Sequence, residues 1–120
     1  MKRLLTGKEL AKLDLVDERI AASAMLRTSR MLPPFADGMT VGRTIIVRPE
    51  KEHSLSLLAH ELVHVEQWRR GRARFMTGYV AAYLKNLPRL RSHRQAYLAI
   101  PAEEEARRRT EEWIAQRSLS

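Results

Sequence analysis

The chain has 120 residues, of which 44% are hydrophobic and 30% are charged, and its formal net charge is +8. This is the composition of an ordinary globular protein, so we expect one domain and exclude a chain that is disordered over most of its length. The chain contains no cysteine, which excludes a disulfide framework and a thiolate zinc site, so any metal ion must be held by His, Asp or Glu.

The amino-terminal segment lacks the apolar stretch of a secretion signal, because Lys8, Glu9, Lys12 and Asp14 interrupt it. No stretch approaches the roughly 18 apolar residues of a membrane span. We therefore expect a cytoplasmic protein.

The positive charge is concentrated between Gln67 and Ala102, where there is no Asp or Glu. Eight basic residues lie there, namely Arg69, Arg70, Arg72, Arg74, Lys85, Arg89, Arg91 and Arg94. Such a segment suits nucleic acid, an anionic membrane or an acidic protein. No nucleic-acid-binding motif accompanies it, so a solvated surface is the favoured interpretation. The oligomeric state is left open.

The first predicted element is an amphipathic helix over residues 6–30 that covers the back of the core. Thr6 or Gly7 can begin it. Its apolar residues recur every three or four positions, at Leu10, Leu13, Val16, Ile20, Ala24 and Leu26. Two prolines at positions 33–34 then stop any helix, and Asp37-Gly38 marks a turn.

Residues 39–48, MTVGRTIIVR, form the best candidate for a strand, because they are rich in β-branched residues and lie between a turn and a proline. Two short strands hinged at Gly42 fit the pattern equally well. Either arrangement is a small sheet or ribbon whose free edge could pair with an extended peptide.

Three further helices are predicted. The helix over 49–70 can start at a proline and end at Gly71, which would let a helix over 75–86 fold back on it. The last helix, over 101–116, opens with a proline and three glutamates that suit the positive end of the helix dipole. The expected fold is therefore a mainly helical single domain of the α+β class.

The strongest functional signal is HELVH at residues 60–64. On a helix, residues four apart share a face, so His60 and His64 can offer imidazole nitrogens to one metal ion. Glu61 stands beside the first ligand, where it can take a proton from metal-bound water, whose pKa zinc lowers from about 16 to about 7. A core face is predicted on the opposite side of this helix, from Leu55, Leu58, Ala59, Leu62 and Val65.

A catalytic zinc site needs a third protein ligand and leaves its fourth position to water. The residues that could supply it are Glu66, His93, Glu103, Glu104 and Glu105. Glu66 lies on a different face of the same helix and is disfavoured. Consecutive helical positions diverge by about 100°, so at most one or two of the three successive glutamates can face the metal.

HELVH followed by a Glu-x-x-Ala helix resembles the gluzincin-type zinc metallopeptidases, in particular the small bacterial minigluzincins. The order MTVGRTIIV, LLAHELVHVEQW and IPAEEEAR is similar to the strand, active-site helix and glutamate helix of that family. The resemblance implies Zn²⁺ held by His60, His64 and Glu103, with Glu61 as the base. It also implies that substrate runs along the strand formed by Val41, Gly42, Arg43, Thr44, Ile45, Ile46 and Val47.

One residue departs from the family pattern. Arg107 stands where several relatives place an acid four residues after the ligand glutamate. Such acids orient ligand histidines, and their loss costs about 10–100-fold in metal affinity or activity, so another group must fill the role or the site is weaker. No spacing rule selects an oxyanion donor among Tyr83, His93 and Tyr97.

The expected function is a zinc-dependent metallopeptidase that hydrolyses peptide bonds in a peptide or protein substrate. The alternative is a zinc-containing binding or regulatory module with a basic surface and weak or no hydrolysis. A third hypothesis is a latent peptidase whose cleft is covered by the amino-terminal helix or by the loop over residues 33–38.

Overall fold

The computed structural model describes residues 2–33, 36–90 and 100–119. The elements in chain order are β1 (Lys2–Leu4), α1 (Gly7–Lys12), α2 (Glu18–Ser23), β2 (Met25–Thr28), β3 (Gly38–Val41), β4 (Thr44–Val47), the 3₁₀ turn η1 (Pro49–Lys51), α3 (Leu55–Leu90) and α5 (Pro101–Leu119). Helices predominate beside one small sheet, which confirms the predicted α+β class.

The sheet has four strands in the order β1-β2-β4-β3. It is mixed, because β2 runs parallel to β4 whereas the β1–β2 and β3–β4 pairs are antiparallel. Two short strands hinged at Gly42 are confirmed. Gly42 has a φ of 63°, in the left-handed region that glycine enters without steric cost, so the β3–β4 connection can be tight.

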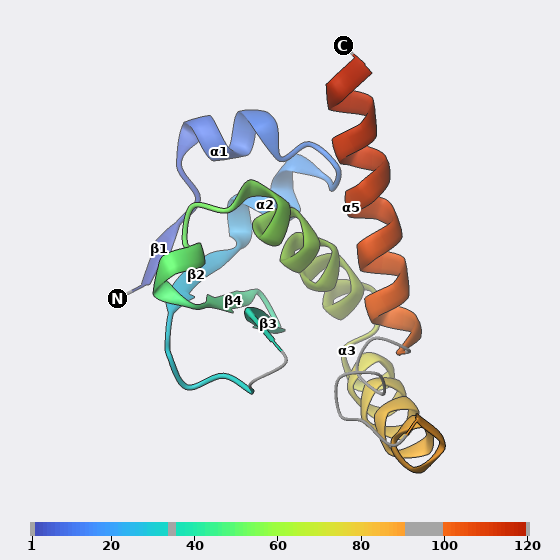
Figure 1. Cartoon of the computed structure of the whole chain (residues 1–120). Helices are drawn as coiled ribbons and strands as arrows, with labels where there is room; N and C mark the ends of the chain where they lie inside the picture. Colours follow the sequence, from blue (N-terminus) through green and yellow to red (C-terminus); the bar gives the residue numbers. More distant parts are fainter. Residues whose placement is uncertain (1, 34–35, 91–99, 120) are drawn as a thin grey trace.

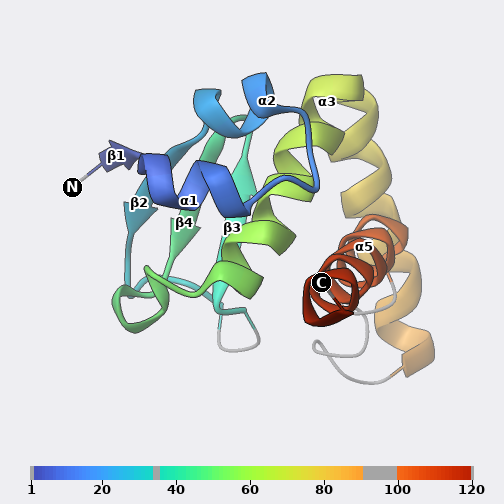
Figure 2. The same cartoon turned by 90° about the horizontal axis from the view of Figure 1, so that it is seen from above.

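The helices form a second layer on one face of the sheet. The first half of α3 lies against β3 and β4, and α5 packs on the other side of α3 (Figures 1 and 2). The short helices α1 and α2 pack against each other, and α2 also contacts α3. Along the described part of the chain, no helix is long and apolar enough to span a membrane.

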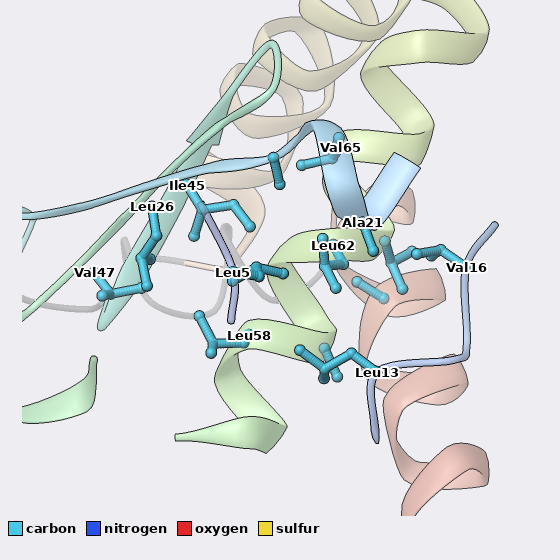
Figure 3. Packing of buried hydrophobic residues seen from close by; sticks show 14 of the residues in the cluster. Leu5, Leu13, Val16, Ala21, Leu26, Ile45, Val47, Leu58, Leu62 and Val65 are labelled. Atoms are coloured by element: carbon cyan, nitrogen blue, oxygen red, sulfur yellow. The ribbon is translucent and has the colours of Figure 1, made fainter. Parts of the chain in front are cut away.

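The core lies between the sheet and α3 (Figure 3). Leu26, Ile45 and Val47 project from the strands toward Leu58 and Leu62 of α3, and all five are at most 1% exposed. Burial alternates along β4, as expected for a sheet covered on one face. The core face predicted for the histidine helix is confirmed at its buried positions, Leu58, Ala59, Leu62 and Val65.

The predicted helix over residues 6–30 is wrong. Thr6 does begin a helix, with a capping box in which Glu9 reaches back to the Thr6 backbone N–H. That helix ends at Lys12, however, and Asp17 caps the start of α2. Residues Met25–Thr28 then form β2, which pairs with a strand on each side.

Most of the predicted apolar positions of this region do face the core, although Leu10 and Ile20 are only half-buried and Ala21 was not among the predicted positions. Leu13, Val16, Ala21, Ala24 and Leu26 are all buried. Two short helices and a strand can bury residues at the same intervals as one long helix, so spacing alone could not separate the two arrangements. The backbone ladder from β2 to its two neighbours decides in favour of the strand.

The histidine helix starts later than predicted and continues further. Pro49 opens only η1, and Ser54 begins α3 by accepting a hydrogen bond from the Leu57 N–H. The predicted break at Gly71 is confirmed as a kink, with φ −167° and ψ 68°. The helix after the kink runs to Leu90 instead of residue 86. The last helix begins at Pro101, as predicted, and ends at Leu119.

Side chains of α5 anchor it to the rest of the fold. Arg109 forms an ion pair with Glu66 of α3, and its guanidinium also donates to the carbonyl of Leu15 over 2.8 Å. The indole N–H of Trp113 donates to Asp14 over 2.8 Å. These contacts fix α5 along α3 and so determine where its first turn lies.

Replacing Glu9 with Gln should reduce the free energy of unfolding by about 1–2 kcal/mol at pH 7, because the carboxylate accepts hydrogen bonds from Arg3 and from the Thr6 N–H. The hydrogen bond from Arg3 lowers the pKa of Glu9 below 4.5. The contribution is therefore present above pH 4.5 and is lost as the pH falls below it.

Urea denaturation of wild type and Glu9→Gln over this pH range measures the difference. The matched control is Glu18→Gln, in the first turn of α2, where the side chain is exposed. A Glu9→Gln penalty that stayed constant down to about pH 3 would contradict the assignment to the ionised carboxylate.

Candidate metal centre

The carboxylate of Glu103 lies against both histidines of the HELVH motif. His60 Nε2 is 2.9 Å from Glu103 Oε1, and His64 Nε2 is 2.9 Å from Glu103 Oε2. The two imidazole rings stand edge to face, with centroids 5.0 Å apart. Three side chains from two helices therefore direct nitrogen and oxygen atoms to one place.

The local structure explains this convergence. The histidines are four residues apart on α3, so both project from the same side of the helix. Glu103 lies in the first turn of α5, where its backbone N–H bonds to the carbonyl of Ile100 over 2.9 Å. Ile100 is 1% exposed, so the start of α5 is held against the body of the protein.

The site is buried, and its charges depend on one another. Glu103 is 2% and His64 is 3% exposed. Burial opposes ionisation of Glu103, but hydrogen bonds from His60 and His64 lower its pKa to about 2. Burial likewise opposes a charged His64, but the contact with Glu103 raises the pKa of His64 to about 9. Without a metal ion, His64 and Glu103 form an ion pair at neutral pH.

Glu61 projects from the same helix toward β3 and is 1% exposed. The hydroxyl of Thr40 donates to its Oε1 over 2.8 Å. A β-carbon at position 38 would lie 3.3 Å from its Oε2, so Gly38 leaves room for the carboxylate. Burial raises the pKa of Glu61. The edge strand β3 thus places this carboxylate, and its buried position makes it more basic.

Gln67 completes the surroundings of His64, and sequence reasoning did not identify it. Its Oε1 is 2.7 Å from His64 Nδ1, while its amide N–H groups donate to the carbonyl of Ala102, over 3.1 Å, and to Glu105. The sequence feature that could have identified Gln67 is its spacing, because a residue three positions after His64 lies on the same face of the helix. Gln67 therefore contacts His64 and also the backbone next to Glu103.

The donor set fits a metal ion such as zinc. His60, Glu61 and His64 form a group whose ligand atoms all lie within 4.8 Å of one another. Glu103 adds a carboxylate that touches both imidazole nitrogens. Two imidazoles with carboxylates are ligands that zinc accepts, whereas calcium and magnesium prefer oxygen atoms alone.

An open cleft of about 320 Å³ reaches the site at His60. The side chain of His60 is 18% exposed, so it is more accessible than His64 or Glu103. The cleft lies between the start of α3 and the face of α5 and is lined by Asp37, Lys51, Ser54, Ser56, Leu57, His60, Arg107, Thr110 and Glu111. A small ligand or a peptide side chain can approach the histidines from this side.

A substrate running along residues 41–47 cannot pair with the backbone of Thr44–Val47. These residues form β4, which pairs with β2 on one edge and with β3 on the other, so no further strand can add to it. β3 is one of the two edge strands, but the indole N–H of Trp68 donates to the carbonyl of Thr40 over 3.0 Å. The backbone carbonyl of Thr40 is therefore already bonded to a side chain of α3.

The other residues considered as ligands lie elsewhere. Glu66 pairs with Arg109, Glu105 bonds to Gln67, and Glu104 is exposed. His93 and Tyr97 lie outside the described residues, as does the side chain of Tyr83.

Most of the basic segment also lies outside the described side chains. Within the described part, Arg69 is exposed and Arg70 forms ion pairs with Glu66 and Glu105.

Residues 16–72 match the family model described as the eCIS core domain. The matched segment includes β2, β3, β4, the HELVH motif and Gln67, and it ends before Glu103. The description of that family names no reaction. No curated protein and no solved structure matches the chain.

Replacing Thr40 with Val should lower the free energy of unfolding by about 1–3 kcal/mol, because the buried Glu61 carboxylate loses its hydroxyl donor while the volume at position 40 hardly changes. Thr40→Ser keeps the hydroxyl and should retain most of the stability. Urea denaturation of the three proteins gives the comparison. Equal losses in the Val and Ser variants would show that the hydroxyl does not hold Glu61.

Proposed function

We propose that this protein is a zinc-dependent metallopeptidase. The observation that carries the proposal is the convergence of His60, His64 and Glu103 beside the buried carboxylate of Glu61. Two imidazoles and one carboxylate are the protein ligands of a known class of catalytic zinc site. A carboxylate next to such a set of ligands is placed to accept and donate protons during the reaction.

His60, His64 and Glu103 would hold the ion. Zn²⁺ bound by them would act as a Lewis acid toward a peptide carbonyl and would make water acidic enough to ionise near neutral pH. The two histidines lie on α3 and Glu103 lies in the first turn of α5, so both helices would contribute to the ligand set.

Glu61 serves as the general base and then as the general acid. It accepts the proton of the attacking water and delivers it to the nitrogen of the leaving amine. Burial raises its pKa, which brings the carboxylate closer to the pH at which it must accept and release a proton. Thr40 keeps Oε1 in place through its hydrogen bond, and Oε2 stays on the side of Gly38.

The substrate is proposed to be a peptide or protein segment that enters by the cleft at His60. The cleft offers two acidic residues, Asp37 and Glu111, and two basic ones, Lys51 and Arg107, with Leu57 among them. This balanced lining favours no single charge class of substrate.

One observation favours a second function, a zinc-containing binding or regulatory module. His64, Glu103 and Glu61 are each at most 3% exposed, and Glu61 belongs to the group that could hold a metal ion. Structural zinc sites are closed by four protein ligands, whereas catalytic sites keep one position open. In the module, Glu61 would be the fourth ligand, and zinc would serve stability and binding.

Glu103→Gln should weaken zinc binding by at least about tenfold, because the carboxylate that faces both imidazoles loses its charge. The matched control is Glu104→Gln, one residue later and exposed. Competition with a chromophoric chelator measures both affinities. His93→Ala belongs in the same series, and loss of zinc in that variant alone would overturn the ligand assignment.

Glu61→Gln should keep zinc and lower the rate of peptide cleavage by about 10²–10⁴-fold, as expected when a general base is removed. Mass spectrometry of a peptide library incubated with each zinc-loaded protein detects cleavage at any sequence that the library contains. The module predicts the reverse, because removing a fourth ligand would weaken zinc binding and no cleavage would depend on the residue. Equal cleavage by the two proteins would refute the mechanism.

A further inference from the structure

We infer that Gln67 is a positioning residue for the metal site, which selects the nitrogen that His64 presents and holds the helix turn that carries Glu103. The inference rests on the proposed metal site and does not depend on peptidase activity. It follows from the contacts of one buried amide, which is 7% exposed.

The orientation of the Gln67 amide is determined by its partners. One end lies at the backbone carbonyl of Ala102 and the carboxylate of Glu105, which accept hydrogen bonds and cannot donate them. The NH₂ group must therefore face these two oxygens. The carbonyl oxygen of Gln67 is left to face His64 Nδ1, at 2.7 Å.

An oxygen acceptor at this distance requires a proton on His64 Nδ1. The other nitrogen, Nε2, is then the one available to a metal ion, and it already points to Glu103 at 2.9 Å. A neutral Nε2 and a carboxylate oxygen are both acceptors and cannot bond to each other. The contact therefore requires either a metal ion between the two atoms or a second proton on the imidazole. Gln67 thus prepares His64 for a cation on the side of Glu103.

The same amide connects the two sources of ligands. Ala102 directly precedes Glu103, so the hydrogen bond from Gln67 to its carbonyl holds the first turn of α5 against α3. A single side chain on α3 therefore fixes the ring of one ligand and the backbone next to another. Leaving this amide unpaired in the interior would be costly, which keeps both contacts in place.

Gln67→Met should weaken zinc binding by about 10–100-fold, because Met fills a similar volume but offers no comparable acceptor for Nδ1 and no donor for Ala102. The matched control is Glu66→Gln. It alters another contact between α3 and α5, the ion pair with Arg109, without touching a histidine. Chelator competition measures zinc affinity, and circular dichroism with thermal unfolding in chelator measures the fold.

The expected result is a large loss of zinc affinity in Gln67→Met and a small one in Glu66→Gln. Equal losses of affinity in the two variants would mean that Gln67 acts only by docking the helices, and the inference would fail.

If the Met variant folds poorly, exchanging the side chains at positions 67 and 105 tests which of the two residues donates the hydrogen bond. Gln67→Glu places a carboxylate against Glu105, whereas adding Glu105→Gln to it restores a donor at that position. The double variant should bind zinc more tightly than Gln67→Glu alone. No improvement would count against the assigned orientation.

Long-range ¹H–¹⁵N NMR of His64 gives an independent readout. Wild type should show a slowly exchanging proton on Nδ1 with or without zinc, and Gln67→Met should lose this protection. If wild type failed to bind zinc, the proposed function would fail while this measurement still decided the role of Gln67. A proton found only on Nε2 would refute the inference.

Discussion

The contact between Glu103 and the two imidazoles is the interaction on which the rest of the site depends. A carboxylate that is 2% exposed is costly unless opposite charge or a metal ion faces it. Two histidines one helical turn apart meet this condition only when α5 lies along α3. Arg109 and Trp113 fix that position through Glu66, Leu15 and Asp14. The amino-terminal segment therefore supports the candidate metal centre from a distance, because it anchors the helix that carries Glu103.

The sheet contributes to the site by holding Glu61, which lies between the two histidines in HELVH. Thr40 makes two contacts with α3, since its hydroxyl donates to Glu61 and its carbonyl accepts from Trp68. The proposed base is thus positioned by β3, while the proposed ligands are joined by α5. Gln67 belongs to the second group, because it bonds to His64 and to the backbone beside Glu103. One helix connects both sets of contacts, and its core face, Leu58 and Leu62 among others, holds it against the strands.

The burial of this centre bears on its chemistry. A dry site strengthens the interactions between its charges and makes Glu61 more basic, which suits proton transfer. It also restricts access, and the cleft that reaches His60 is the route by which a substrate could enter. The same burial would suit a closed structural zinc site. The difference between the two functions therefore lies in whether Glu61 is a ligand or a base.

The sequence by itself determined the features that depend on local spacing. It predicted HELVH on a helix with a core face, the kink at Gly71 and the start of α5 at Pro101, and it gave the hinge at Gly42 as one of two alternatives, because each depends on contacts within a few residues. It did not reveal β1 and β2, whose strand pairing joins distant segments, and the same apolar intervals suited a helix. Local spacing left Glu103, Glu104 and Glu105 as alternatives, and only the family resemblance implied Glu103. The tertiary structure brought Glu103 to the histidines, paired β4 with β2 and placed Gln67 between His64 and Ala102. Each of these contacts between two elements joins residues that lie far apart in the chain, so no local sequence pattern predicts it.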